Sequence, residues 1–436
     1  MLDFPLRKYP HMRLVCLFTL LTGSVWAQQA LTVADFFNQD AVNDVFIHTA
    51  DWQTLQQNFK DDTYYPADVY WRGQVISNVG IRVKGRTSRR ATKPGLKVDI
   101  DRFQDQSFLG LKAFLLDNAI QDFTTQKERI AMDLFRRMGI PAPMEAHVRV
   151  YVNSEYLGLY ALVEDTDKRF LKRNFGEDSG YLYEHEFKDQ FFLNYLGEDP
   201  ALYSPFPFKP ETKESSPDPA PLVEMMRAIN LSSDEEFESA VDKYVDIKAY
   251  LTQVAVESFI TEVDGITSPE GVNNVYFYRF DKQTRGIFIP KDKDNAFNAS
   301  DWPVLLNADR HPLFGRALKV PALRQHYFDE LLRAADVAEG DGWMEREFLR
   351  VADLIRPSAR IDGLKECPNG VCSLEDSNYF FEVFVNFVAQ QIHDRPAYVR
   401  AEVAQLMAGA DPELAVEAFR NTGTLSRARP AAVSGK

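Results

Sequence analysis

The hydrophobic pattern changes its period part-way along the chain, and this change limits the fold more than any other feature of the sequence. Early in the chain, Val79, Ile81 and Val83 alternate with polar residues, which is typical of half-buried strands. Beyond about residue 220, apolar residues recur at helical spacing, as Ile247 and Leu251 do. No repeat with a period of about 20 to 50 residues is present, which disfavours solenoids and propellers. The pattern predicts an α+β fold with a β-rich first region and a mainly helical second region.

Turn-forming residues and helical spacing divide these two regions into elements. We expect strands at residues 69–71, 79–83, 96–100, 148–152, 156–164, 275–278 and 286–289. We expect helices at residues 124–138, 246–259, 318–335, 341–355 and 375–408. Pro396 is expected to break the last helix, because proline has no backbone N–H to donate. Residues 187–220 are rich in Pro, Tyr and Phe, and predict a long surface excursion.

The N-terminus has the three parts of an export signal. Basic residues such as Arg7 and Arg13 accompany a short apolar run at residues 14–22, and Ala27 is the small residue expected before a cleavage point. We therefore assign residues 1–27 to a signal peptide and predict an exported protein, periplasmic or extracellular. The apolar run is too short for a comfortable membrane span, so no stable span is expected.

Charge and missing motifs disfavour several classes of protein. The chain has 64 acidic and 50 basic side chains, a formal net charge of -14 at pH 7. This balance argues against a nucleic-acid partner, which would select for a basic face. The sequence also lacks the G-x-x-x-x-G-K-[ST], G-x-G-x-x-G, H-E-x-x-H and G-x-S-x-G motifs. Their absence disfavours P-loop enzymes, Rossmann dehydrogenases, zincins and α/β-hydrolases.

Two cysteines, Cys367 and Cys372, remain once the signal peptide is set aside. Pro, Asn and Gly lie between them and favour a tight turn, which would bring the thiols within bridging distance. A disulfide is expected in the oxidising compartment that export implies. A metal site is the weaker reading, because the mature chain has no further cysteine and no nearby histidine-rich segment.

A set of acidic and amide side chains lies at the ends of the predicted helix and strands of the second region: Asp264, Asn273, Asn274, Asp292 and Asp294. Phosphoryl transfer needs hard oxygen ligands for a divalent metal and a carboxylate that orients the accepting hydroxyl. Residues two apart on a strand point the same way, so Asp292 and Asp294 are expected to share one metal region. The alternative is that these carboxylates lie in solvated turns and bind nothing. The apolar strands that precede them disfavour this alternative.

A calcium loop is a further alternative for the residues that begin at Asp292. The segment starts like an EF-hand loop, but Ala296 supplies no ligand and Phe297 occupies the position that requires glycine. The EF-hand reading therefore fails.

A basic segment from Lys84 to Lys93 carries five Lys or Arg side chains in ten residues. Its guanidinium groups, including that of Arg86, and its Gly and Ser/Thr amides suit phosphate oxygens. Lys97, on the polar face of the next strand, is expected to reach the same phosphates as a point charge. An exposed basic hairpin tip with no ligand is the alternative.

Several ordered blocks resemble the spore coat protein H (CotH) kinase family over roughly residues 52–297. They include Asn118, Asp122 and Arg129 ahead of and within the expected helix, and residues 150–164 as the most specific block. In the second region the matching positions are Asp264-Gly265, Asn274 before Tyr276-Phe277-Tyr278, and Pro290, Asp292, Asp294 and Phe297.

The resemblance implies a divergent protein-kinase-like fold of two lobes, with a β-rich N-lobe at 28–165, a helical C-lobe at 166–419 and a disordered tail at 420–436. It further implies ATP, Mg²⁺ or Mn²⁺ as cofactors and Ser or Thr of a protein substrate that the sequence does not identify. The oligomeric state is likewise not predicted.

The resemblance also implies roles for individual side chains. Asp264 and Asp292 would be catalytic, while Asn274, Asp292 and Asp294 would hold metal. The nucleotide would be bound by Lys97, together with Arg86 of the basic segment, and by Glu164 near the lobe junction.

The sequence departs from the family pattern at Lys291, Lys293, Asn298 and Glu184. Two ammonium groups beside the metal aspartates would either assist phosphate binding or displace a metal. These departures keep open a second reading, an exported family member with weak or no catalysis that acts in surface adhesion or assembly.

Overall fold

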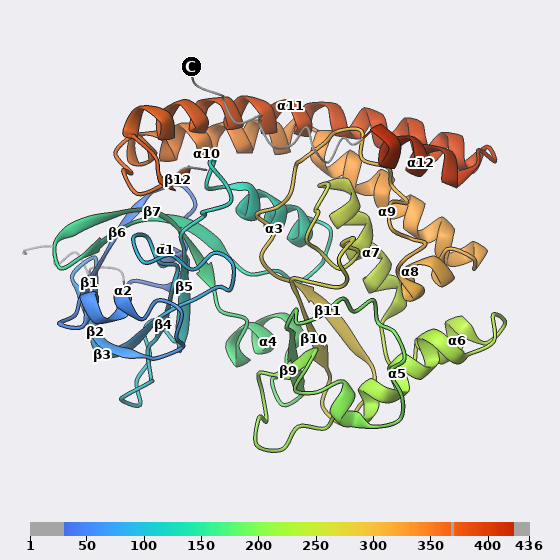
Figure 1. The fold of residues 1–436 in the computed structure, drawn as a ribbon, viewed down its shortest axis with the longest axis horizontal. Helices are drawn as coiled ribbons and strands as arrows, with labels where there is room; N and C mark the ends of the chain where they lie inside the picture. Colours follow the sequence, from blue (N-terminus) through green and yellow to red (C-terminus); the bar gives the residue numbers. More distant parts are fainter. Residues whose placement is uncertain (1–29, 368–369, 423–436) are drawn as a thin grey trace, which may run out of the picture.

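The computed structural model describes residues 30–367 and 370–422. The predicted signal peptide lies outside the described residues, as does most of the predicted tail. Within the described part, the protein is a mixed α+β structure whose first region is rich in sheet and whose last region is helical (Figure 1).

Seven strands of the first region form a closed barrel in the order β1-β2-β3-β4-β5-β7-β6. Closure comes from β1, which pairs antiparallel with β2 on one side and parallel with β6 on the other. The strands are β1 (Asn43–His48), β2 (Tyr65–Trp71), β3 (Gln74–Val83), β4 (Leu96–Asp99), β5 (Ala113–Asp117), β6 (Glu145–Val152) and β7 (Glu155–Glu164). Two short helices, α1 (Val33–Phe36) and α2 (Trp52–Gln57), accompany them.

Local turn chemistry fixes two of the barrel hairpins. Arg72 and Gly73 link β2 to β3 with φ of 44° and 78°, and Asn153 and Ser154 link β6 to β7 with φ of 49° and 74°. Positive φ at both central residues matches the two-residue turn that follows the natural twist of a hairpin. Alternate strand residues then point inward, and the ring of Phe36 lies edge-on to three further aromatic rings in the barrel core, those of Trp71, Phe108 and Phe114.

A second sheet has the order β11-β10-β8-β9, with all neighbours antiparallel. Its strands are β8 (Tyr181–His185), β9 (Phe208–Pro210), β10 (Val275–Arg279) and β11 (Gly286–Pro290). β9 comes from the segment that we predicted to be a surface excursion. That prediction was incomplete, since the segment also buries Tyr203 and Phe208 in the larger hydrophobic core.

The helices pack mainly around this larger core (Figure 1). They are α3 (Lys127–Arg137), α4 (Lys168–Phe175), α5 (Ala220–Leu231), α6 (Phe237–Val241), α7 (Ile247–Phe259), α8 (Pro312–Ala317), α9 (Pro321–Glu339), α10 (Trp343–Ala359), α11 (Leu374–Met407) and α12 (Pro412–Thr422), with a single 3₁₀ turn at Pro200–Leu202. α3 belongs to the sheet-rich region by sequence, yet its apolar face lies in the core shared by α7 and α9. No helix within residues 30–367 and 370–422 has the length and apolar character that a membrane crossing requires.

The start of α3 and the start of the C-terminal tail differ from those predicted. α3 begins at Lys127 rather than at residue 124, because the Asp122 carboxylate binds the backbone N–H groups of Thr124, Gln126 and Lys127 and holds the preceding turn outside the helix. Residues 420–422, assigned to the tail, form the last residues of α12, where Arg420 pairs with Asp309.

The predicted break at Pro396 is wrong, because α11 continues through it. An interior proline costs roughly 3 kcal/mol in a helix. Tertiary contacts on both sides of this proline offset that cost, with Ile392 and Val399 buried in the core. The neighbouring Arg395 guanidinium donates to four backbone carbonyls, those of Ser258, Phe259, Ser300 and Trp302.

The connection between α10 and α11 reaches back to the barrel. It carries the short strands β12 (Glu366–Cys367) and β13 (Gly370–Val371) and the predicted disulfide, which joins Cys367 of β12 to Cys372 directly after β13. Lys93 and Asp362 form a fully buried ion pair at its base. Lys365 is also buried, and donates to Ala119 O, Asp122 O and Thr125 Oγ1. The connection thereby fixes α10 and α11 to the barrel.

Candidate active site

The turn between α7 and β10 holds one carboxylate between two amides. Asp264 Oδ1 accepts from Asn273 Nδ2 at 2.7 Å, and Asp264 Oδ2 accepts from Asn274 Nδ2 at 3.2 Å. Burial raises the pKa of Asp264 above its ordinary value, although the bond from Asn273 opposes the change. Both carboxylate oxygens are therefore oriented by neighbouring side chains, and the group is a stronger base than a solvated aspartate.

The end of β11 brings two further carboxylates to the same place. Lys291 N donates to Asn274 O at 3.1 Å, which continues the β10–β11 pairing up to Asp292 and Asp294. Asp294 is buried, and its pKa is raised well above the ordinary value by burial and then by the negative charge of Asp292. The structure thus brings together Asp264, Asn274, Asp292 and Asp294, while the catalytic and metal-binding roles that the resemblance implies for them stay predictions.

The barrel and α3 add three charged residues: Lys84, which begins the predicted basic segment, and Asp117 and Glu128, which sequence reasoning missed. Lys84 follows β3 and its ammonium binds the Asp117 carboxylate at the end of β5. Burial opposes the charge on Lys84, but the negative charges of Asp117, Asp292 and Glu128 raise its pKa above the ordinary value. Asp292 therefore lies within electrostatic reach of the barrel.

Negative charge exceeds positive charge in this cluster. The pKa of Glu128 is raised well above normal by burial, and by the charges of Glu145, Asp292 and Asp117. Such an excess favours a bound cation, and carboxylate and amide oxygens are the ligands that Mg²⁺ prefers. Among the described residues, no three Asp, Glu, His or Cys side chains converge as a complete metal cage. The donors therefore suit a metal that takes one or two carboxylates and completes its shell with phosphate oxygens or water.

Unusual backbone conformations gather at the same turns. Thr261, Asn274, Asp292 and Phe297 have φ of 53°, 51°, 51° and 59°, in the left-handed region that residues with a Cβ avoid. Such conformations persist only where surrounding contacts impose them, and they concentrate at functional sites. Asn298 contributes one such contact, since its backbone N–H donates to Thr261 Oγ1 at 2.8 Å.

The two lysines that depart from the family pattern have carboxylate partners. Lys291 pairs with Glu184 on β8. Burial raises the pKa of that carboxyl, but the charge and hydrogen bond of Lys291, together with the charge of Lys209, hold the pKa at about 2. Lys293 is buried and pairs with Glu257 on α7 at 3.0 Å. Neither ammonium group is left as an unbalanced charge beside the aspartates.

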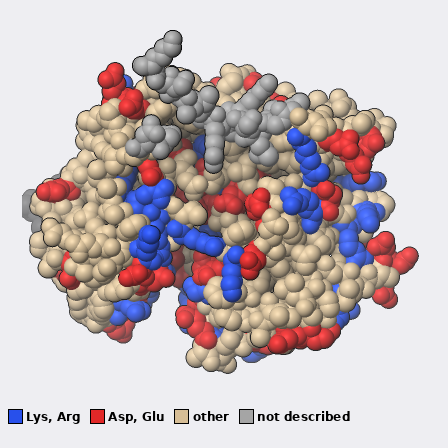
Figure 2. Space-filling model, viewed as in Figure 1, with Lys and Arg blue, Asp and Glu red and all other residues tan. Residues whose placement is uncertain are grey.

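The predicted nucleotide-binding residues have other partners in the structure. Lys97 pairs with Asp165 at 2.8 Å, and Arg86 lies over the ring of Phe187 at 5.6 Å from its centroid. Glu164, at the end of β7, binds the Arg173 guanidinium through both oxygens. Figure 2 shows Lys and Arg side chains gathered on the edge of the barrel that faces the rest of the molecule, with acidic side chains beside them.

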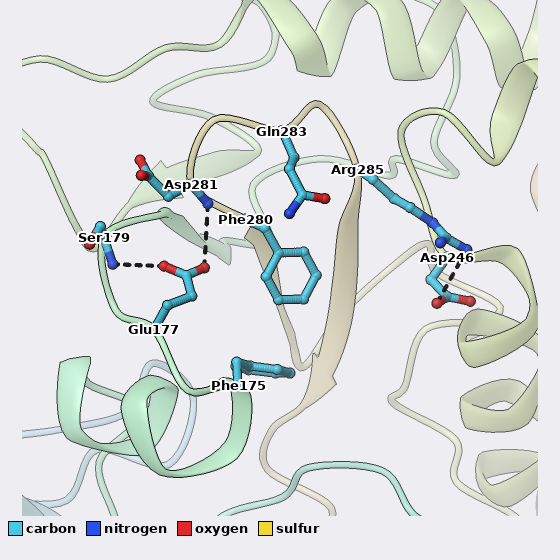
Figure 3. Close-up of a pocket in the computed structure, with 8 residues that line it drawn as sticks. All are labelled: Phe175, Glu177, Ser179, Asp246, Phe280, Asp281, Gln283 and Arg285. Carbon is cyan, nitrogen blue, oxygen red and sulfur yellow. Dashed lines mark hydrogen bonds and ion pairs between the residues drawn. The ribbon is translucent and has the colours of Figure 1, made fainter.

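A separate surface cavity of about 530 Å³ lies at the other end of the β10–β11 hairpin (Figure 3). The rings of Phe175 and Phe280 line it together with Glu177 and Arg285. The Glu177 carboxylate accepts from two backbone N–H groups, and Arg285 pairs with Asp246. Glu177 and Arg285 therefore already have partners within the protein, and the cavity is distinct from the acidic cluster.

The family model of the CotH kinase proteins matches residues 81–358, which is more than half of the chain. The chain therefore belongs to the CotH kinase protein family. The inner spore coat protein H of Bacillus subtilis (strain 168) is 23% identical over 329 residues, covering 74% of this chain and 88% of that protein. The family match includes Asp264, Asn274, Asp292 and Asp294, whereas Cys367 and Cys372 lie outside it.

Among solved structures, the Helicobacter pylori proinflammatory kinase CtkA aligns with 71% of this CotH family member and 95% of its own chain. The identity is 10% and the TM-score is 0.28, a level of similarity from which we draw nothing.

Proposed function

We propose that this protein is an exported kinase that transfers the γ-phosphate of ATP to Ser or Thr of a partner protein, with Mg²⁺ or Mn²⁺. Membership of the CotH kinase protein family supports a kinase-like function. The observation that carries the proposal is the cluster of Asp264, Asp292 and Asp294 beside Lys84, which combines a carboxylate base, metal ligands and a phosphate-binding cation.

The proposal assigns a role to each member of the cluster. Asp264 orients the acceptor hydroxyl and takes its proton, because both of its oxygens are held by amides and burial raises its pKa. Asn274, Asp292 and Asp294 hold the divalent metal, which neutralises charge on the phosphates when bound. Lys84 contacts phosphate oxygens, with Arg86 and Lys97 as further cations on the same barrel edge.

A two-lobed arrangement is part of the proposal. The barrel with its flanking segments, residues 28–165, would form the N-lobe, and residues 166–419 the helical C-lobe. The acidic cluster supports this division, because Asp117 comes from the barrel and Asp292 from the second sheet. ATP would bind where these two parts meet, as in protein kinases.

Export is supported by the disulfide between Cys367 and Cys372, since disulfides persist in oxidising compartments. The signal-like pattern at residues 1–27 points the same way. The protein would then act in the periplasm or outside the cell.

The test is transfer of labelled phosphate from ATP by the purified protein from Gln28 onward, with Mg²⁺ or Mn²⁺, to itself and to a generic acceptor protein. Asp292→Ala is expected to abolish transfer. Asp281→Ala is the matched control, because Asp281 follows β10 at the opposite end of the hairpin.

Metal-dependent transfer that Asp292→Ala loses and Asp281→Ala keeps would support the kinase. No transfer, together with no thermal shift on adding nucleotide, would favour the adhesion or assembly role for this family member.

A further inference from the structure

We propose that the buried pair Lys293–Glu257 is a positioning device, which fixes the turn that carries Asp292 and Asp294 against Asn274 and the Asp264 turn. Neither residue would touch substrate. The effect of this pair on catalysis rests on the proposed function. Its effect on the position of the turn can be measured without any activity.

The Lys293 ammonium joins three segments of the site. It lies 3.0 Å from Glu257 Oε1 on α7 and 3.0 Å from the backbone carbonyl of Asn274. Its own backbone lies between the two aspartates at the end of β11. The ammonium is 0% exposed and Glu257 is 1% exposed, so water does not compete for these contacts.

The Glu257 carboxylate adds a fourth segment. Its Oε2 accepts from the backbone N–H of Ile266 at 2.6 Å, two residues after Asp264. Its Oε1 also accepts from Gln253 Nε2 at 3.2 Å, one turn earlier on α7. One buried carboxylate is therefore bonded to the β11 end, to α7 and to the Asp264 turn.

Gly265 shows how closely the carboxylate approaches that turn. A Cβ atom at this position would lie 2.0 Å from Glu257 Oε2, well inside contact distance. Only glycine leaves room for the carboxylate to reach the Ile266 N–H. The close approach of Glu257 therefore requires glycine at position 265, directly after Asp264.

Stability alone gives a weak reason for this arrangement. Replacing a buried ion pair by apolar side chains of similar volume is often neutral or stabilising. The pair instead fixes the relative positions of segments that an apolar contact would leave free to slide. Positions that set active-site geometry need such directional bonds, because a misplacement of about 1 Å slows chemistry by roughly a hundredfold.

The experiment compares Lys293→Met, Glu257→Gln and the double variant Lys293→Met/Glu257→Leu with the wild type. Each single variant leaves a buried charge or polar group without its partner and is expected to lower Tm. The double variant removes both charges and is expected to recover most of that stability. Arg279→Met is the control, since Arg279 pairs with Asp218 at the far end of β10.

Two readouts decide the outcome. In the double variant we expect amide hydrogen exchange over residues 291–298 to rise at least about tenfold while Tm stays near that of the wild type. We also expect kcat to fall about tenfold or more while KM for ATP changes less than about threefold, as for a loss of transition-state alignment. Arg279→Met should leave the amide exchange over residues 291–298 and the kinetic constants unchanged.

Wild-type exchange over residues 291–298 in a stable double variant would overturn the proposal. If the wild type transfers no phosphate, the proposed function fails, but the exchange measurement still decides whether the pair fixes the turn. Raised exchange with unchanged kcat would overturn the catalytic part alone.

Discussion

Lys84 forms an ion pair with Asp117, and this pair brings a cation from the loop after β3 to the edge of the acidic cluster. The sequence pointed to the basic segment that begins at Lys84 and also to Lys97 as phosphate ligands, and in the structure Lys97 pairs with Asp165. The difference gives a direct test of which lysine serves the reaction.

Lys84→Met is expected to lower kcat/KM for ATP by about a hundredfold, the usual scale for losing one charged group that stabilises the transition state. Lys97→Met should cost less than about tenfold, because the carboxylates beside Lys97 are Asp165 and Glu211, whereas Lys84 lies within electrostatic reach of Asp292. Steady-state kinetics would give kcat/KM for ATP in both variants and in the wild type. A larger loss in Lys97→Met would restore the role that the sequence suggested.

Asp264→Asn is expected to lower kcat by about a thousandfold or more, because an amide cannot take the proton of the acceptor hydroxyl. Tm should change by only a few degrees, since the new carbonyl oxygen can still accept from Asn273 Nδ2 and only the longer bond from Asn274 Nδ2 is lost. Turnover at the wild-type rate would remove Asp264 from the mechanism.

Three buried histidines predict loss of stability in mild acid. Burial is the main reason that the pKa values of His147, His185 and His311 are each lowered to about 4. Well above pH 6.5 these histidines are neutral in both the folded and the unfolded chain, so they do not change the free energy of unfolding with pH. Between pH 6.5 and 4 only the unfolded chain binds the protons, so the free energy of unfolding falls as pH falls.

The upper limit of this loss is on the order of 3 kcal/mol for each histidine. Denaturant unfolding at pH 7.5, 6.5 and 5.5 would measure it. His147→Gln should weaken the pH dependence, because glutamine does not titrate. An unfolding free energy that stays constant between pH 6.5 and 5.5 would contradict the prediction.

The disulfide is expected to stabilise the connection between α10 and α11 without serving the reaction. Cys367→Ser/Cys372→Ser should cost about 2 kcal/mol, because the closed loop is short. Thermal unfolding with and without reductant would measure this in the wild type, and the double variant should be insensitive to reductant. Loss of phosphate transfer without loss of Tm would show a functional role that we do not expect.

Local patterns were enough to predict much of the fold. The strands β2, β3, β6, β7, β10 and β11 were predicted because alternation and turn residues act within a few positions. The same holds for Asp264, Asn274, Asp292 and Asp294, which neighbour one another through a single hairpin and the turn before it.

Contacts between distant segments could not be predicted in this way. Asp117 and Glu128 join the cluster only because the barrel and α3 pack against the second sheet. Lys293 was expected beside the metal because it lies between Asp292 and Asp294 in the sequence, yet Glu257 holds its side chain in the interior. Pro396 was expected to end a helix that packing continues.

The bond between Lys93 and Asp362 joins residues that are 269 positions apart. During synthesis, which starts at the N-terminus, all seven barrel strands are therefore complete long before Asp362, the residue that neutralises Lys93, is made. Until then the barrel carries a buried cation without its counter-ion, a state that costs several kcal/mol. The barrel should not reach its final stability as an isolated fragment, and a chain cut before Asp362 should stay open to proteolysis at its N-terminal part.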